Sequence, residues 1–245
     1  MVHGLPDWGL RGPKSTTYGL DDLGEAVARL GSPVVWDRRG DVVAIESFEG
    51  SGGSYDTHAW GVGAAVHRTC AGAHTGAYGY ALTAGSNGLC AASVFILSPA
   101  LVLGPCGLEI WFGLNPNTEY IAIDFVYYTG TEVIDALLRY SHALSTVSVY
   151  AEGPVWHEFA AGITLPNWGV PKHVIKLVAN FDTRRYVRAI VNEVTYDLHT
   201  IPMYVAGDPT DSQVIGNVIH GAVPLTNPEI IVDDLILTQN EPVSL

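Results

Sequence analysis

The chain has 245 residues, of which 48% are hydrophobic and only 15% are charged, so it can bury a substantial core and does not have the composition of a disordered protein. Its formal net charge of −13, without any basic stripe, argues against a nucleic-acid partner. The apolar run from Ala91 to Leu103 is interrupted by Ser98-Pro99 and is shorter than the roughly 20 residues that a membrane helix needs, so we expect no membrane span.

The first 44 residues differ from the rest of the chain. Met1 to Ser15 is polar and rich in glycine and proline, which is typical of an extended arm. The segment YGLDDLGEAVARLGSP then predicts one short helix, because Asp22 and Glu25 have the spacing of a capping box. About ten residues are too few for a stable isolated helix, so we expect its apolar stripe to dock on the body or on a neighbour. The stripe consists of Leu20, Leu23, Val27 and Leu30.

Residues 45–245 read almost entirely as strands and turns. The clearest alternation runs from Glu119 to Tyr128, with Ile121, Ile123, Phe125 and Tyr127 on one face. Further strands are predicted at 94–97, 108–112, 133–140, 145–150, 155–160, 214–220 and 230–237.

The segment from His173 to Leu198 predicts three strands joined by two tight turns. The first turn falls at residues 182–184, and the second begins at Asn192, a residue type that tolerates the positive φ of a short hairpin. Many strands without an alternation of strand and helix indicate an all-β, antiparallel β-sandwich. We therefore predict a sandwich body at 45–245 that is preceded by a docking arm at 1–44.

Motifs at both ends of the body suggest a family. ESFEG, Trp60 in HAWGVG and AGAHTGAYGYALTAG stand near the start, and IVDDLILTQNEP stands near the end. This pattern resembles the jelly-roll β-sandwich of concanavalin A-like lectin/glucanase domains and related carbohydrate-binding modules, over roughly Val43 to Pro242. The resemblance implies that Trp60 is a core residue.

The same resemblance implies a structural Ca²⁺ where the first and last strands meet. Glu46 or Glu49, together with Asp233 or Asp234, are the candidate acidic ligands, and calcium prefers six to eight oxygen ligands. Consecutive aspartates on a regular strand point to opposite faces, so at most one of Asp233 and Asp234 should face inward. The alternative interpretation is an aspartate that is hydrogen-bonded beside a turn. No other cofactor is expected.

Sugar binding in such modules uses aromatic rings that stack on sugar rings, with amides and carboxylates around them. The candidate platforms are Trp111, Tyr127, Tyr128, Trp156 and Trp168, although most aromatic residues of a sandwich fill its core. Catalytic residues are not expected. Glu119 and Asp124 are five positions apart, which places them on opposite faces of an extended strand, and the histidines lack zinc-site spacing.

A helical arm fused to such a sandwich is similar in layout to bacteriophage decoration or fibre proteins. That resemblance implies a non-enzymatic virion structural protein, anchored by its arm to capsid or tail proteins and displayed on the virion surface as a dimer or trimer. The amino terminus lacks a signal core, so synthesis in the host cytoplasm is expected. The alternative is a carbohydrate-binding module or lectin that recognises cell-surface or polymeric glycans.

Overall fold

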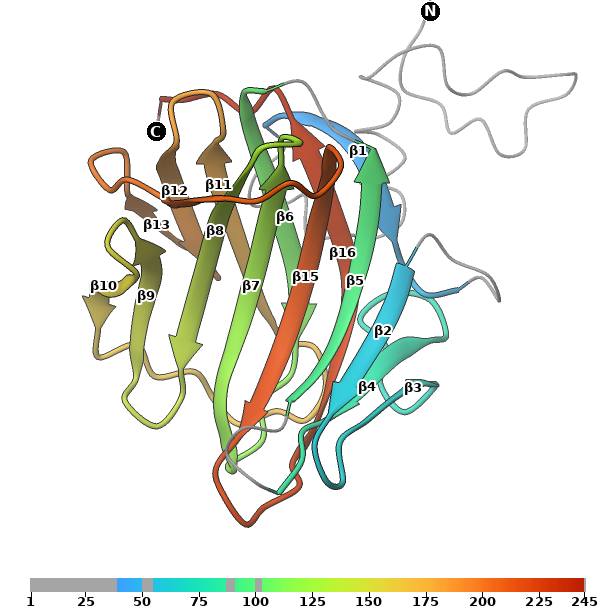
Figure 1. Ribbon diagram of the computed structural model, residues 1–245. Coiled ribbons are helices and arrows are strands. Elements are labelled where there is room, and N and C mark those ends of the chain that lie inside the picture. Colours follow the sequence, from blue (N-terminus) through green and yellow to red (C-terminus); the bar gives the residue numbers. More distant parts are fainter. Residues whose placement is uncertain (1–38, 50–54, 87–90, 100–102, 245) are drawn as a thin grey trace, which may run out of the picture.

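The computed structural model describes residues 39–49, 55–86, 91–99 and 103–244, which form sixteen β-strands. The strands build two antiparallel sheets that lie face to face (Figure 1). The predicted antiparallel jelly-roll β-sandwich is confirmed for this part of the chain. The predicted docking helix and the arm up to residue 38 lie outside the described residues. Among the described residues, no helix is long and apolar enough to cross a bilayer.

The rear sheet in Figure 1, here called sheet A, contains the last strand of the chain near its centre. Its order is β13 (Val194–Asp197), β12 (Arg185–Val191), β11 (His173–Asn180), β6 (Pro105–Phe112), β16 (Glu229–Gln239), β4 (Gly79–Thr83) and β3 (Ala65–Thr69). Strand β1 (Asp41–Glu46) also pairs with β16, so the predicted boundary between residues 44 and 45 falls inside a strand of the sandwich.

The front sheet, sheet B, has β7 at its centre. Its order is β10 (Val155–Ala161), β9 (Thr146–Ala151), β8 (Glu132–Ser141), β7 (Thr118–Tyr128), β15 (Gln213–Ala222), β5 (Ala91–Pro99) and β2 (Tyr55–Trp60). A further short strand, β14 (Tyr204–Gly207), pairs with the first half of β8, while β9 pairs with its second half.

Alternating side chains of the two sheets fill the space between them. On β7, Ile121, Ile123, Phe125 and Tyr127 all belong to one buried core cluster, so the predicted inward face of this strand is confirmed. Because successive side chains of a strand point to opposite faces, Asp124 points away from that core. Asp124 and the other outward-pointing side chains of sheet B therefore form the outer surface of the sandwich on this side.

All the strands predicted from residue 94 onward are present, with ends that shift by at most three residues. Of the strands from residue 55 onward, four were not predicted: β2, β3, β4 and β14. Asn192 has φ +51°, which confirms the left-handed residue expected at the β12–β13 turn. Trp60 does not belong to the buried core and is only partly buried on β2 at the edge of sheet B, so the expectation of a core tryptophan was wrong.

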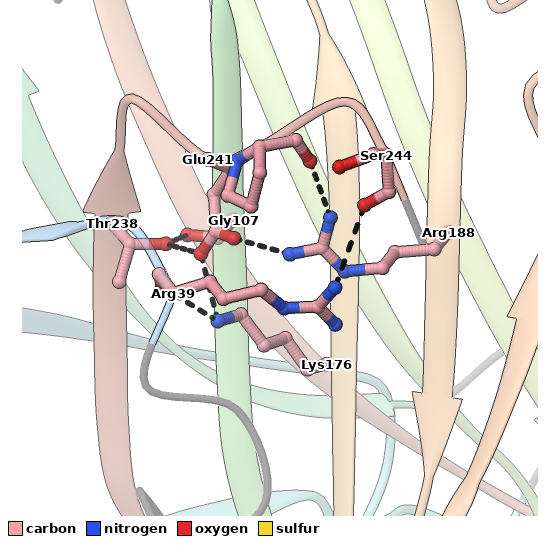
Figure 2. Close-up of polar contacts among 8 residues, drawn as sticks. Arg39, Gly107, Lys176, Arg188, Thr238, Glu241 and Ser244 are labelled. Carbon is pink, nitrogen blue, oxygen red and sulfur yellow. Dashed lines mark hydrogen bonds and ion pairs between the residues drawn. The ribbon is translucent and has the colours of Figure 1, made fainter.

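A buried charged cluster holds the carboxyl-terminal segment on the outer face of sheet A (Figure 2). The Glu241 carboxylate lies 2.7 Å from the Lys176 ammonium and also forms an ion pair with Arg188. It accepts a 2.6 Å hydrogen bond from the Thr238 hydroxyl. All three charged side chains are at most 3% exposed. Buried charges are tolerated only when they are paired, so this cluster fixes the segment after β16 to the body.

The same segment also meets the start of the described chain. The Arg188 guanidinium donates to the Pro242 carbonyl at 2.6 Å, and the Arg39 side chain donates to the Ser244 carbonyl at 3.4 Å (Figure 2). The side-chain amide of Asn240 donates to the Asp41 carboxylate at 2.7 Å. The two ends of the described body are thus tied together over sheet A.

Candidate functional site

The five predicted aromatic platforms occupy different environments. Trp111 is 7% exposed on sheet A and stacks on the His74 ring at 3.7 Å, and Tyr127 is part of the core. Trp168 is 48% exposed but lies in the segment between β10 and β11, where it stacks on His173. Tyr128 and Trp156 both point outward from sheet B, and Trp156 is 38% exposed. Two of the five residues therefore share one face.

That face carries a continuous series of aromatic, acidic and amide side chains, here called the outer row. It consists of Trp156, Tyr150, Tyr204, Asp135, Asp124 and Asn217. The members come from β10, β9, β14, β8, β7 and β15, so the outer row crosses most of sheet B. Its length is roughly 19 Å at the usual spacing between neighbouring strands.

Each link of the outer row follows from a pairing or a ring contact. Trp156 is the register partner of Tyr150, and their ring centroids lie 5.4 Å apart. The centroids of Tyr150 and Tyr204 lie 5.3 Å apart, and Tyr204 is the register partner of Asp135. Asp124 is the register partner of Asn217, and the side chains of Asp135 and Asn217 lie near enough to influence the pKa of its carboxyl group. The row is therefore aromatic at one end and polar at the other.

The two aspartates of the outer row both have a pKa above the ordinary value of an aspartate. Burial raises the pKa of Asp124 above its ordinary value, because a buried carboxylate loses its hydration. Burial, with the negative charge of Asp124 as a further cause, raises the pKa of Asp135 to about 7. One oxygen of each carboxyl group and the Asn217 side-chain oxygen are buried without a hydrogen-bond partner among the described residues. Two carboxyl groups in direct contact hold one proton between them more readily than two charges.

The aromatic end of the outer row is held in place by neighbouring side chains. The Arg139 guanidinium carbon lies 3.9 Å from the centroid of the Trp156 ring, which is a cation–π contact. The Tyr186 hydroxyl donates to the Tyr150 carbonyl at 2.6 Å and accepts from the Leu137 amide at 3.1 Å. It thereby bridges β8 and β9 at the point where β8 changes partner from β9 to β14. The rings are consequently placed by the scaffold rather than by a loop.

The four residues predicted as calcium ligands form hydrogen bonds with other groups of the protein. Asp233 accepts hydrogen bonds from the amides of His74 and Thr75 at 2.8 and 3.0 Å. Asp234 accepts from the Thr75 hydroxyl at 2.8 Å and lies 2.8 Å from the Nδ1 atom of His74. Both carboxylates therefore hold the loop that precedes β4.

The two glutamates do not complete a metal site with them. Glu49 accepts from the amides of Ala77 and Tyr78, both at 2.8 Å, on the same loop, and Glu46 accepts from the Phe48 amide at 2.8 Å. Within the described ranges, no group of three or more His, Cys, Asp or Glu residues is arranged to hold a metal ion. The hydrogen-bonded alternative describes these carboxylates better than calcium ligation does.

A β-bulge in β16 allows the side chains of both Asp233 and Asp234 to reach the loop that precedes β4. The register with β6 shifts between Asp233 and Ile236, and Asp234 has φ +49°. The expectation that consecutive aspartates point to opposite faces assumed a regular strand, and the bulge removes that condition. Burial, followed by the charge of Asp234, raises the pKa of Asp233 to about 7.

Of the outer row, the sequence predicted only Trp156 as a sugar platform; Tyr128 points outward from the same sheet but is not a member of the row. Asp124 was considered only as a catalytic partner of Glu119, and Asp135, Tyr150, Tyr204 and Asn217 were not considered. What these residues share in the sequence is that each is a polar or aromatic residue at an outward position of an otherwise apolar strand. That signal becomes specific only when the strand order is known.

Comparisons with known proteins give fold likenesses at low identity. No family model and no curated protein matches the chain. A solved structure described as the basis for the promiscuous specificity of carbohydrate-binding modules from the β-sandwich superfamily is 14% identical, with a TM-score of 0.45. It covers 82% of this chain, and this chain spans only 63% of that one.

Two further neighbours are similar over nearly their whole length. Cip1, a cellulose-induced protein, is 13% identical with a TM-score of 0.47, over 80% of this chain and 97% of its own. A protein of unknown function with a galectin-like fold from Bacillus subtilis is 12% identical with a TM-score of 0.48, over 82% of this chain and 97% of its own.

Proposed function

We propose that this protein is a non-enzymatic carbohydrate-binding domain and that the outer row of sheet B is its binding surface. The observation that supports this proposal is the series of ring contacts and strand pairings that runs from Trp156 through Tyr150 and Tyr204 to the carboxyl pair and Asn217 on one face of the sheet. Partly exposed rings stack on the apolar faces of sugars, while carboxyl and amide oxygens accept hydrogen bonds from sugar hydroxyls. The outer row supplies both kinds of group on a rigid sheet.

The carboxyl pair favours binding over glycoside hydrolysis. Glycosidases act through two carboxyl groups that lie about 5–10 Å apart, on either side of the bond that is cleaved. The carboxyl groups of Asp124 and Asp135 are neighbours on one face of sheet B that influence each other's pKa, which suits joint binding of hydroxyl groups better than action from opposite sides of a sugar linkage. They can still bind hydroxyl groups together, one as an acceptor and the other as a donor.

The predicted virion role depends on the arm, which lies outside the described residues, and it therefore stays a prediction. The same holds for a dimer or trimer and for capsid or tail partners. Nothing in the outer row requires these partners.

The proposal is tested by screening the full chain on an array of neutral and acidic glycans and by affinity electrophoresis in gels that contain soluble polysaccharides. We expect binding to at least one class of uncharged glycan, because the formal net charge is −13 and two carboxyl groups lie in the outer row. A wild-type protein that binds no glycan in either assay overturns the proposal.

A further inference from the structure

An open pocket lies at the corner of the sandwich where the outer row ends. Its volume is about 460 Å³, within the range of roughly 300–1,000 Å³ that is usual for small-molecule sites. One wall is the turn between β9 and β10, and the other is the connection that leads from β13 to β14. Its lining includes Glu152, Trp156, His157, Thr200 and Pro202.

The two walls of the pocket are joined to each other. The Glu152 amide donates to the Pro202 carbonyl at 3.3 Å, and Ala151 forms a β-bridge with Met203. At the tip of the turn, Gly153 has φ +79°, a conformation that favours glycine. The pocket is thus formed by connected backbone segments before any ligand arrives.

Trp156 belongs both to the pocket and to the outer row. Arg139 covers one face of the ring at 3.9 Å, which leaves the remainder of the ring for contacts elsewhere. Strand β10 is the edge strand of sheet B, so a ligand that follows the outer row past Tyr150 reaches this pocket at the end of the sheet. The pocket therefore extends the aromatic end of the row.

The polar groups of the pocket are available to a ligand. Neither the Glu152 carboxylate nor the His157 imidazole has a side-chain partner among the described residues, and both residues are exposed. Glu152 supplies acceptors, His157 can donate or accept, and the Thr200 hydroxyl can do both. The only carboxylate in the lining would repel an acidic sugar, which favours an uncharged ligand.

We propose that this corner pocket is an end subsite, which takes the terminal residue of an uncharged glycan whose chain lies along the outer row. This inference rests on the proposed function and adds the part of the glycan that is recognised. The turn and the crossing connection bound the pocket on two sides, so its size suits the end of a chain. Hydroxyl groups found only on a terminal residue would bind Glu152, His157 and Thr200.

The test uses the full chain and neutral hexasaccharides of glucose, xylose and mannose, each with free ends and with methylated terminal residues. Isothermal titration calorimetry with wild type should give affinity about tenfold higher for the free-ended form of the bound sugar, because methylation leaves polar groups of the pocket unpaired. In the Glu152→Gln/His157→Ala variant this ratio should fall below about threefold. Trp168→Ala, which alters an exposed tryptophan outside the pocket, should keep the wild-type ratio.

The possible failures can be told apart. If wild type binds a hexasaccharide through Trp156 but free and methylated ends bind equally, the end subsite is wrong and the outer row remains. A double variant that keeps the full tenfold ratio also overturns the end subsite. If wild type binds none of these sugars and no glycan on the array, both this inference and the proposed function fail; binding to the array without binding to any uncharged oligosaccharide overturns only the end subsite. Both substituted side chains are exposed, and circular dichroism and thermal unfolding verify that the variant folds.

Discussion

The guanidinium carbon of Arg139 on β8 lies over the indole ring of Trp156 on β10, 3.9 Å from its centroid. The two residues belong to different strands, with β9 between them. The contact fixes a ring that is 38% exposed, at the point where the outer row meets the corner pocket. A ring held in this way loses little rotational freedom when a ligand stacks on it.

Replacing Arg139 should therefore weaken glycan binding without unfolding the protein. For Arg139→Ala we expect a two- to fivefold loss of affinity, which corresponds to the roughly 0.5–1 kcal/mol of a partly exposed cation–π contact. Arg139→Lys should recover part of the loss, since an ammonium group can also lie over the ring. Calorimetric titration of the three proteins measures this effect, and equal affinity in all three would show that the ring needs no such support.

The charged cluster on sheet A should contribute to stability and not to binding. In Glu241→Gln, Lys176 and Arg188 lose their common carboxylate partner, and we expect a cost of about 3–5 kcal/mol in the free energy of unfolding. The matched control is Glu132→Gln, which removes the exposed ion pair with Arg184 and should cost at most about 1 kcal/mol. Urea unfolding of both variants gives the comparison. Similar costs would mean that the buried cluster is not special.

Calcium should not stabilise the protein, because the carboxylates proposed from sequence as its ligands are already hydrogen-bonded to the protein. A site with a dissociation constant 100-fold below the calcium concentration would add about 2.7 kcal/mol. We expect the midpoint of thermal unfolding to differ by less than about 1 °C between millimolar Ca²⁺ and EDTA, far below the shift that such a gain would cause. A rise of several degrees would place a metal in the protein.

The loop that precedes β4 should depend on Asp233. In Asp233→Ala, the amides of His74 and Thr75 lose their acceptor, and we expect a loss of about 1–3 kcal/mol of stability. Hydrogen exchange at these two amides should accelerate more than exchange in β11. Unchanged protection at His74 and Thr75 would contradict the assigned hydrogen bonds.

The carboxyl pair of the outer row should make stability depend on pH. The folded protein holds the proton of Asp135 up to a pKa of about 7, whereas an unfolded aspartate releases it near 3.8. The stability contributed by this proton is present below about pH 4 and is lost as the pH rises through about 7. Asp135→Asn cannot ionise at this position, so its stability relative to wild type should increase between these pH values, on the order of 1–3 kcal/mol. Unfolding of both proteins at several pH values checks this, and a constant difference would contradict the raised pKa.

The sequence patterns predicted the strands whose alternation or apolar content is strong. The alternation around Ile121 to Tyr127 and the hairpin at Asn192 are local signals, and both are confirmed. Strand β2 was missed because Asp56, Thr57 and His58 give no apolar face, and the residues of this edge strand are largely exposed. Local chemistry alone therefore located most of the two sheets.

Features that join distant parts of the chain could not be predicted in the same way. The outer row joins residues from Asp124 to Asn217. Its order depends on β8, which pairs with β14 in its first half and with β9 in its second half. The bulge at Asp234 is a local deviation that no alternation pattern encodes. The position of the site therefore depends more on the order of the strands and on local bulges than on which segments form strands.

The most direct test of the glycan-binding face compares two tryptophans of similar exposure. Trp156 is 38% exposed on the outer row, and Trp168 is 48% exposed outside it. With the glycan identified on the array, we expect Trp156→Ala to reduce affinity at least tenfold in calorimetric titration, as alanine substitution of a main aromatic contact commonly does. Trp168→Ala should bind as wild type does. Equal affinity of Trp156→Ala and wild type, or a loss confined to Trp168→Ala, would contradict the assignment of the outer row as the binding surface.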